Sequence, residues 1–173
     1  MKRSGVFLLT LCMLGAAGCD DYGDTAPSNQ PLVFTATLSA QNEVPPVSNA
    51  ESGATGTATV TLTPTRDTAG AITGGTFQFQ FSVAGLTSSS NIILTHIHQA
   101  AAGVVGGVVV NSGLSAATSI PTPVGTASFD RSGLTASAST TPAAIVANPA
   151  GFYFNVHTSA NPGGVVRGQL VAR

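Results

Sequence analysis

The strict alternation of apolar and polar side chains along residues 76–83 is the feature that most restricts the fold. Phe77, Phe79 and Phe81 occupy every second position, and glutamines separate them. Side chains two positions apart lie on one face of a β-strand, so this segment predicts a strand with one face in a core and the other toward solvent. The three rings are expected to supply much of the volume of that core.

The same two-residue period recurs along most of the chain and predicts many short strands. Segments rich in Gly, Pro, Asn and Ser, which are typical turn residues, separate them. The other large core side chains are expected to be Phe129, Phe152 and Phe154. We expect strands at residues 32–39, 55–63, 76–83, 91–98, 108–110, 124–129, 134–139, 152–157 and 165–171.

One short helix is expected near residues 141–147. Thr141 suits the N-cap position and Pro142 suits the first helical position. Many short strands without a long helix favour an all-β fold, either an antiparallel β-sandwich or a barrel. Residues 32–173 are long enough to bury the core of one such domain.

The first 18 residues have the layout of a secretory signal peptide. Lys2 and Arg3 precede an apolar run, which small residues and then Cys19 follow. The run is too short to span a membrane stably. The Ala-Ala-Gly-Cys ending resembles a lipobox, in which signal peptidase II cuts before an acylated cysteine. We therefore expect residues 1–18 to be removed and Cys19 to carry lipid; an ordinary signal peptide that contains a cysteine is the alternative.

Residues 19–31 are polar and small, and they predict a flexible tether between the lipid and the folded domain. Cys12 lies in the removed segment, so Cys19 is the only thiol expected in the mature chain, which can form no internal disulfide. The expected location is the cell envelope, with the domain anchored to a membrane and facing the periplasm or the exterior. Charged residues make up only 8% of the chain and form no basic stripe, which disfavours nucleic acid as a partner.

The three histidines of the chain are the residues most able to carry chemistry. His96 and His98 lie two positions apart on a predicted strand, so both rings point to one face. His157 ends another predicted strand, on the face shared with Asn155. If the two strands are neighbours, three imidazoles converge and offer ligands for Zn²⁺ or Cu²⁺. A hydrogen-bonded structural cluster and three unrelated surface histidines are the alternatives.

A hairpin is expected to bring a charged residue to the same region. The Asn-Pro-Gly-Gly turn at residues 161–164 would fold the last strand back beside residues 152–157. Arg167 would then lie near His157. Glu43, in a proline-containing loop, is a candidate partner for Arg167, and a plain surface ion pair is the alternative.

Several segments together resemble the CHRD domain, a repeat named from chordin that is also found in bacterial secreted proteins. They are residues 38–46 (Leu-Ser-Ala-Gln-Asn-Glu-Val-Pro-Pro), 56–59 (Gly-Thr-Ala-Thr), 95–98 (Thr-His-Ile-His) and 154–170, which runs from Phe-Asn-Val-His to Val-Arg-Gly-Gln-Leu. The resemblance covers nearly all of residues 32–173 and implies an immunoglobulin-like β-sandwich. It implies no defined molecular role in bacteria, because the growth-factor binding of chordin does not suit a bacterial lipoprotein.

Two positions depart from the pattern of this family. Gln99 stands where a glycine usually follows His-Ile-His. Val165 stands where an acidic residue commonly precedes the Val-Arg-Gly segment. The second departure removes a carboxylate from beside the His157 hairpin, which makes an acidic metal ligand there less expected.

The sequence therefore predicts a non-enzymatic binding module of the cell envelope with a three-histidine site for zinc or copper. No nucleophile elbow, phosphate loop or pair of suitably spaced carboxylates is present. The expected partners are the membrane, through the lipid, and an envelope protein or a glycan. One alternative is a metal-dependent enzyme, since His-x-His on a strand is similar in pattern to Cu,Zn superoxide dismutase, although that copper site needs a fourth imidazole. The other is a purely structural envelope protein in which the histidines order the hairpins.

Overall fold

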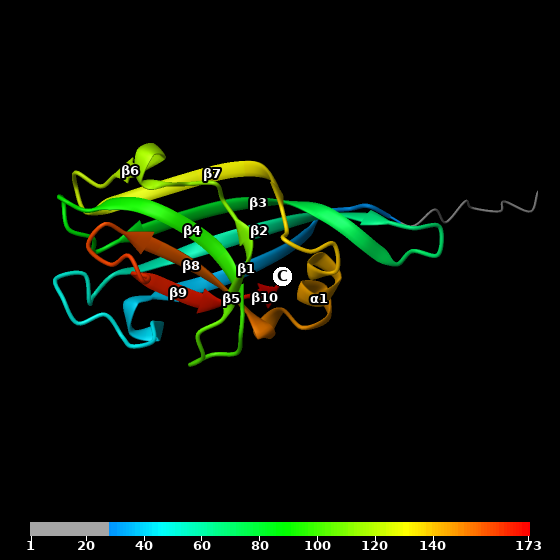
Figure 1. Cartoon of the computed structure of the whole chain (residues 1–173), viewed down its shortest axis with the longest axis horizontal. Helices are drawn as coiled ribbons and strands as arrows, with labels where there is room; N and C mark the ends of the chain where they lie inside the picture. Colours follow the sequence, from blue (N-terminus) through cyan, green and yellow to red (C-terminus); the bar gives the residue numbers. More distant parts are fainter. Residues whose placement is uncertain (1–27) are drawn as a thin grey trace, which may run out of the picture.

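The computed structural model describes residues 28–173 (Figure 1), while the expected signal peptide, Cys19 and most of the expected tether lie outside the described residues. The described part contains one α-helix, α1 (Thr141–Ala147), and short 3-10 turns, the first being Ala40–Asn42. Its strands are β1 (Leu32–Ser39), β2 (Thr55–Arg66), β3 (Ile72–Ala84), β4 (Asn91–Gln99), β5 (Gly107–Asn111), β6 (Ile120–Pro121), β7 (Thr126–Thr135), β8 (Phe152–Thr158), β9 (Val166–Gln169) and β10 (Val171–Ala172).

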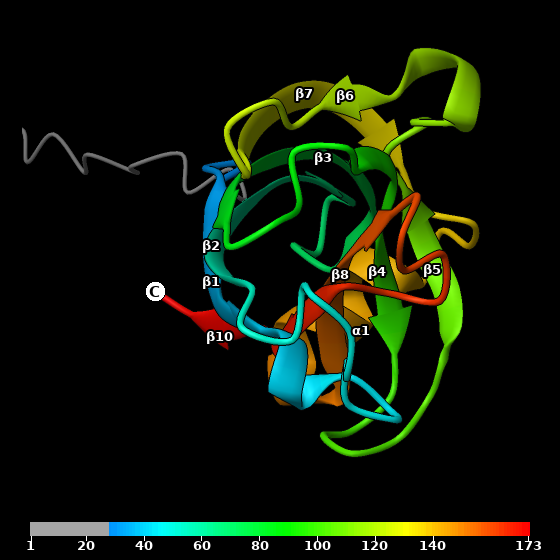
Figure 2. The ribbon, with the colours of Figure 1, turned by 90° about the vertical axis from the view of Figure 1, so that its left-hand side faces the viewer.

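All strand pairs are antiparallel and belong to one sheet with the order β5-β4-β8-β9-β1-β2-β3-β7. The short strands β6 and β10 pair with β4 and β1. The two ends of this path approach each other, because Val110 forms a bridge with Ala136 and the Ser137 amide donates to the Val109 carbonyl at 2.8 Å. The sheet thus curls into a nearly closed, barrel-like sandwich (Figure 2), which confirms the all-β antiparallel class.

The core lies inside this curled sheet, where the alternation of β3 puts it. Phe77, Phe79 and Phe81 are buried, whereas Gln80 between them is exposed. Aromatic rings from opposite sides of the sheet meet there: the Phe79 ring lies edge-on to Phe154 with centroids 5.1 Å apart. Helix α1 packs against β3 and buries Ile145 completely. Among residues 28–173 no helix is long and apolar enough to cross a membrane.

Several details differ from the sequence prediction, and three of them follow. The two strands expected at residues 124–129 and 134–139 are the single strand β7, because Gly133 (φ +74°) accommodates a register shift instead of ending the strand. The strand expected at residues 165–171 is divided into β9 and β10, since the chain leaves β8 at Leu170 and continues along β1. Thr141 is not the N-cap of α1; Thr140 precedes the helix, without a side-chain capping bond.

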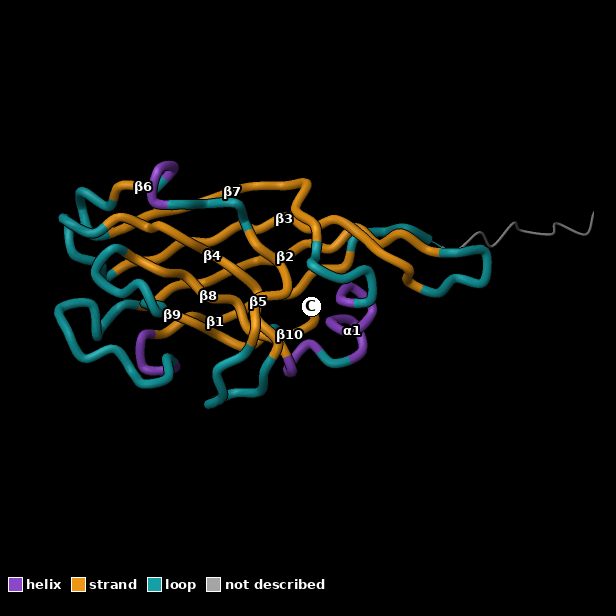
Figure 3. Tube along the Cα trace, in the orientation of Figure 1, coloured by secondary structure: helices purple, strands orange, loops and turns teal. Residues whose placement is uncertain are grey.

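Strand β8 is buried on both faces, although one of them is polar. Phe152, Phe154 and Val156 face the core. Tyr153 and Asn155, on the opposite face, are also buried, because the loops at residues 40–54, 100–106 and 159–165 cover that side. Figure 3 shows the loops in teal, including those at the end of β8. A covered polar face on a central strand is where the candidate site lies.

Candidate metal centre

Strands β4 and β8 bring the three histidines to one buried face. In the β4–β8 register His96 lies opposite Asn155 and His98 opposite Tyr153, while His157 follows two positions after Asn155. One ring nitrogen from each histidine lies within 4.8 Å of the others, and His96 Nδ1 is 3.3 Å from His157 Nε2. The three side chains are only 6–8% exposed. The structure therefore places together the residues that the sequence singled out.

Backbone carbonyls fix the tautomers of two of the rings. His98 Nδ1 lies 3.0 Å from the Gly106 carbonyl oxygen, and His157 Nδ1 lies 2.9 Å from that of Pro162. A carbonyl oxygen can only accept, so both Nδ1 atoms carry the proton and both Nε2 atoms carry a lone pair. His157 Nε2 then accepts from His96 Nδ1. His98 Nε2 is buried without any hydrogen-bond partner.

Burial keeps the three imidazoles neutral. It lowers the pKa of His96 to about 4, with further lowering from the neighbouring His157 and His98. Burial also lowers the pKa of His98 and that of His157, against the opposite effect of their carbonyl partners. Neutral imidazole is the form that binds metal ions, so the cluster needs to lose no proton to the solvent before binding one.

The geometry fits a three-coordinate metal site if the three ring nitrogens, which lie within 4.8 Å of one another, move slightly closer together. Zn–N bonds of about 2.0–2.1 Å put neighbouring ligand nitrogens roughly 3.3–3.6 Å apart, and the His96–His157 pair already has this separation. The ligand atoms would be Nε2 of His98, Nε2 of His157 and Nδ1 of His96, whose proton would move to its own Nε2. The carbonyls of Gly106 and Pro162 would then orient two of the ligands, as outer partners of metal-bound histidines generally do.

Gly106 holds two stacked rings at once. Its carbonyl accepts from His98, and its amide donates to the Tyr153 hydroxyl at 3.2 Å. The His98 and Tyr153 rings stack with centroids 4.8 Å apart and an interplanar angle of 2°. A Cβ atom at Gly106 would lie 2.2 Å from the Gln99 carbonyl oxygen, so no larger residue fits without moving the loop. Sequence reasoning missed both Gly106 and Tyr153; the only signal was a glycine pair shortly after His-x-His.

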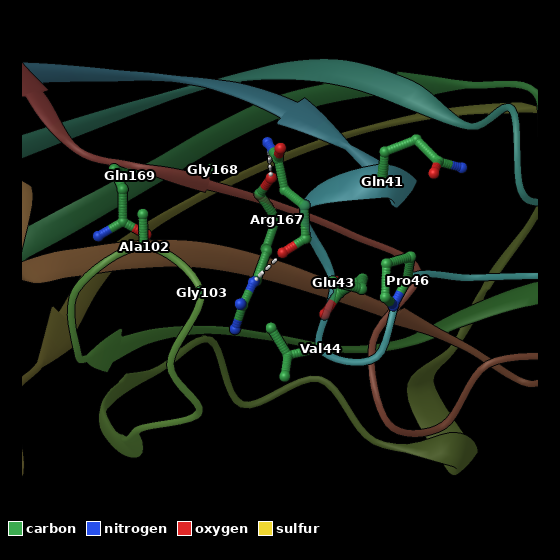
Figure 4. Close-up of a pocket in the computed structure, with 10 residues that line it drawn as sticks. Gln41, Glu43, Val44, Pro46, Ala102, Gly103, Arg167, Gly168 and Gln169 are labelled. Atoms are coloured by element: carbon green, nitrogen blue, oxygen red, sulfur yellow. Dashed lines mark hydrogen bonds between the residues drawn. The ribbon is translucent and has the colours of Figure 1, made fainter.

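Arg167 lies on the other side of Tyr153. Its guanidinium carbon is 4.7 Å from the centre of the Tyr153 ring, and Nε and Nη1 donate to the carbonyls of Asn42 and Val104 at 2.5 and 3.1 Å. Figure 4 shows Arg167 reaching toward the loop that carries Glu43. Both residues line a hollow of about 400 Å³. Arg167 is 3% exposed, and its Nη2 atom has no partner. Arg167 thus lies beside Tyr153 and Asn155, and its positive charge contributes to the lowered pKa of His98.

Glu43 is close enough to Arg167 for their charges to interact, but it is not an exposed partner. It is 6% exposed, and its Oε1 atom is buried without a hydrogen bond. Burial raises the pKa of Glu43 to about 7, against the opposing effect of Arg167. The carboxylate lies against Gly164, where a Cβ atom would be only 2.8 Å from either oxygen.

A second buried acid, Glu51, anchors the loop that orients His157. Its carboxylate accepts hydrogen bonds from the Thr87 amide and hydroxyl, from Thr158 Oγ1 at 2.7 Å and from Asn161 Nδ2 at 2.6 Å. Burial alone would raise the pKa of Glu51, but these hydrogen bonds outweigh it and lower the pKa. Sequence reasoning could not identify this role, because Glu51 lies in a loop and its partners are far away in the chain.

Comparison with known proteins yields one match. A family model described as the CHRD domain covers residues 34–170, a span that begins in β1, ends just after β9 and contains all three histidines. Searches of curated proteins and of solved structures found no match.

Proposed function

Since this chain belongs to the CHRD domain family, we propose that it is a non-enzymatic, lipid-anchored module of the cell envelope that binds a transition metal ion. The ligands are His96, His98 and His157, and the ions that suit them are those of zinc and copper. An envelope protein or a glycan is the macromolecular partner that such an anchored module would meet.

The observation that carries the metal proposal is the convergence of three imidazole nitrogens in a buried space. Three ring nitrogens lie within 4.8 Å of one another, and Nε2 of His98 has no proton donor near it. A buried acceptor without a partner costs about 1–3 kcal/mol. A metal ion would satisfy this atom and its two neighbours together.

The structural alternative accounts for these contacts less well. A cluster that serves only to order hairpins would be expected to satisfy each ring nitrogen with a protein donor or acceptor. His96 Nδ1 and both ring nitrogens of His157 meet this expectation, but the buried Nε2 of His98 does not. The dismutase-like alternative needs a fourth imidazole for copper, and the sequence has three histidines, so no observation favours it.

Metal titration tests the proposal directly. The purified full chain, stripped with a chelator, would be titrated with Zn²⁺, with Cu²⁺ and, under reducing anaerobic conditions, with Cu⁺. We expect saturable binding of at least one ion with one site per chain, lost in His98→Ala and His157→Ala. The matched control is Gln99→Ala, an exposed neighbour on the same strand. Failure of all three ions to bind at micromolar concentrations would refute a metal function.

The anchor is a separate part of the proposal and has its own test. It is supported by the basic start, the apolar run and the small residues before Cys19. In bacterial cells supplied with labelled palmitate, the wild-type chain should be labelled and should sediment with membranes. Cys19→Ala should lose both properties, whereas Cys12→Ala should keep them. Equal labelling of the two variants would overturn the anchor.

A further inference from the structure

We infer that this site, if it binds metal as proposed, selects copper in its +1 oxidation state over divalent zinc and copper. The first reason is the ligand set. All three ligands are neutral imidazoles, and among residues 28–173 no carboxylate joins the group of converging ligand atoms. The bound ion therefore keeps its full charge in a buried position, because no ligand brings a compensating negative charge.

The second reason is the buried charge around the cluster. Within the described residues the buried charged side chains other than histidine are Glu43, Glu51 and Arg167. Glu43 interacts with Arg167. The net charge of this pair is 0 when Glu43 is ionised and +1 when it is protonated. The Glu51 carboxylate is held by the neutral donors Thr87, Thr158 and Asn161, and it contributes −1. The protein thus offers between 0 and −1 of buried charge.

A single positive charge fits this environment better than two. With Cu⁺ the buried charge sums to between +1 and 0, whereas with Zn²⁺ or Cu²⁺ it sums to between +2 and +1. The Born cost of burying an ion rises with the square of its charge, so a dication costs about four times as much as a monocation of the same size. Neutral ligands recover less of this cost for a dication than a carboxylate or thiolate would.

The third reason is the stack that leads from a fixed cation to one of the ligands. The Arg167 guanidinium lies over one ring, Tyr153, that stacks on His98. The positive charge of Arg167 opposes additional positive charge on the metal. The number of ligands is compatible with Cu⁺, which is stable with three nitrogens, whereas Zn²⁺ on three histidines would need a water in its fourth position.

The experiment compares the three ions on the same protein. Dissociation constants for Cu⁺ would be measured anaerobically by competition with a chromogenic Cu⁺ chelator, and those for Zn²⁺ and Cu²⁺ by calorimetry. We expect Cu⁺ to bind at least about 1,000-fold more tightly than Zn²⁺, and the potential of the bound copper couple to lie above that of aqueous copper. Zn²⁺ or Cu²⁺ binding as tightly as Cu⁺ would overturn this inference and leave the proposed metal function intact. Binding of no ion would overturn both.

Variants at Arg167 separate charge from structure. Arg167→Gln should reduce the preference for Cu⁺ over Zn²⁺ at least tenfold and lower the copper potential, by about 59 mV for each tenfold change in the ratio of Cu⁺ to Cu²⁺ affinity. Arg167→Lys keeps the charge but not the two-carbonyl geometry, and it should retain the wild-type preference. If both variants change the potential equally, Arg167 acts only through structure and this part of the reasoning is wrong. The distant exchange Arg66→Gln, in the β2–β3 hairpin, is the control.

Discussion

Replacing Glu43 by Gln should make the stability of the domain depend differently on pH. Folding raises the pKa of this carboxyl from its usual 4.5 to about 7, because the side chain is buried. The folded state therefore binds the proton more tightly than the unfolded state. The stabilisation that results is complete below about pH 4.5 and is lost as the pH rises through 7. Glutamine keeps the shape that fits against Gly164 but cannot titrate.

The size of the effect follows from the two pKa values. Between pH 5 and pH 9 the linkage relation gives a loss of roughly 2.6 kcal/mol for a shift of this size, or about 2 kcal/mol after a discount for solvent screening. The free energy of unfolding would be measured by urea denaturation of both proteins at pH 5, 7 and 9. The difference between Glu43→Gln and the wild type should move by about 2 kcal/mol in favour of the variant as the pH rises.

A comparison within the same loop controls for the effect of the substitution itself. Gln41→Ala changes an exposed, uncharged neighbour, so its difference from the wild type should be the same at every pH. A constant difference between Glu43→Gln and the wild type from pH 5 to pH 9, within about 0.5 kcal/mol, would show that Glu43 is ionised throughout. The reasoning from its burial would then be refuted.

Three further predictions concern the cluster and its supports. In the metal-free Glu43→Gln background, acidification from pH 7 to pH 5 should destabilise the domain by up to about 2 kcal/mol through His96 alone, since unfolded histidine protonates near 6.5 and the buried one near 4; a urea series with no such loss would contradict this. Gly106→Ala should weaken metal binding at least tenfold, because it displaces the carbonyl that orients His98. Gly107→Ala should leave metal binding unchanged, because a Cβ atom at Gly107 meets open space. Calorimetric titration of the two variants measures the difference. Glu51→Ala should lower the free energy of unfolding by about 3–5 kcal/mol, because it leaves several buried donors without an acceptor; a loss under 1 kcal/mol in urea denaturation would contradict that role.

Local patterns sufficed for most of the strands and for the shared face of His96 and His98, whereas the convergence with His157 also depended on the order of the strands. The alternation along residues 76–83 appears in β3 as Phe77, Phe79 and Phe81 buried on one face, because a period of two is read from neighbours alone. His96 and His98 share a face for the same reason. Their approach to His157 needed only that β4 and β8 be adjacent, and the sheet order makes them so.

The supports of the site could not be read in this way, because they depend on contacts between distant parts of the chain. Arg167 pairs with Asn155, two positions before His157, and the loop carbonyls of Asn42 and Val104 hold its side chain beside Tyr153. Glu51 binds partners more than thirty residues away, as its bond to Thr87 spans 36 positions. Such partners follow from tertiary packing, and no local period or propensity encodes them.

The register of the sheet also sets how far the cluster lies from the point where an anchor would be attached. Ser39, Arg167, Asn155 and His96 form one row across β1, β9, β8 and β4. The chain enters the sheet at Leu32, seven residues before Ser39, which is about 23 Å away at the usual rise per residue of a strand. A lipid on Cys19 would be joined through the flexible tether to the Leu32 end of β1, so the point of attachment would not cover the histidine row. Soluble donors or acceptors of metal could then reach the cluster from the open compartment without competing with lipid headgroups.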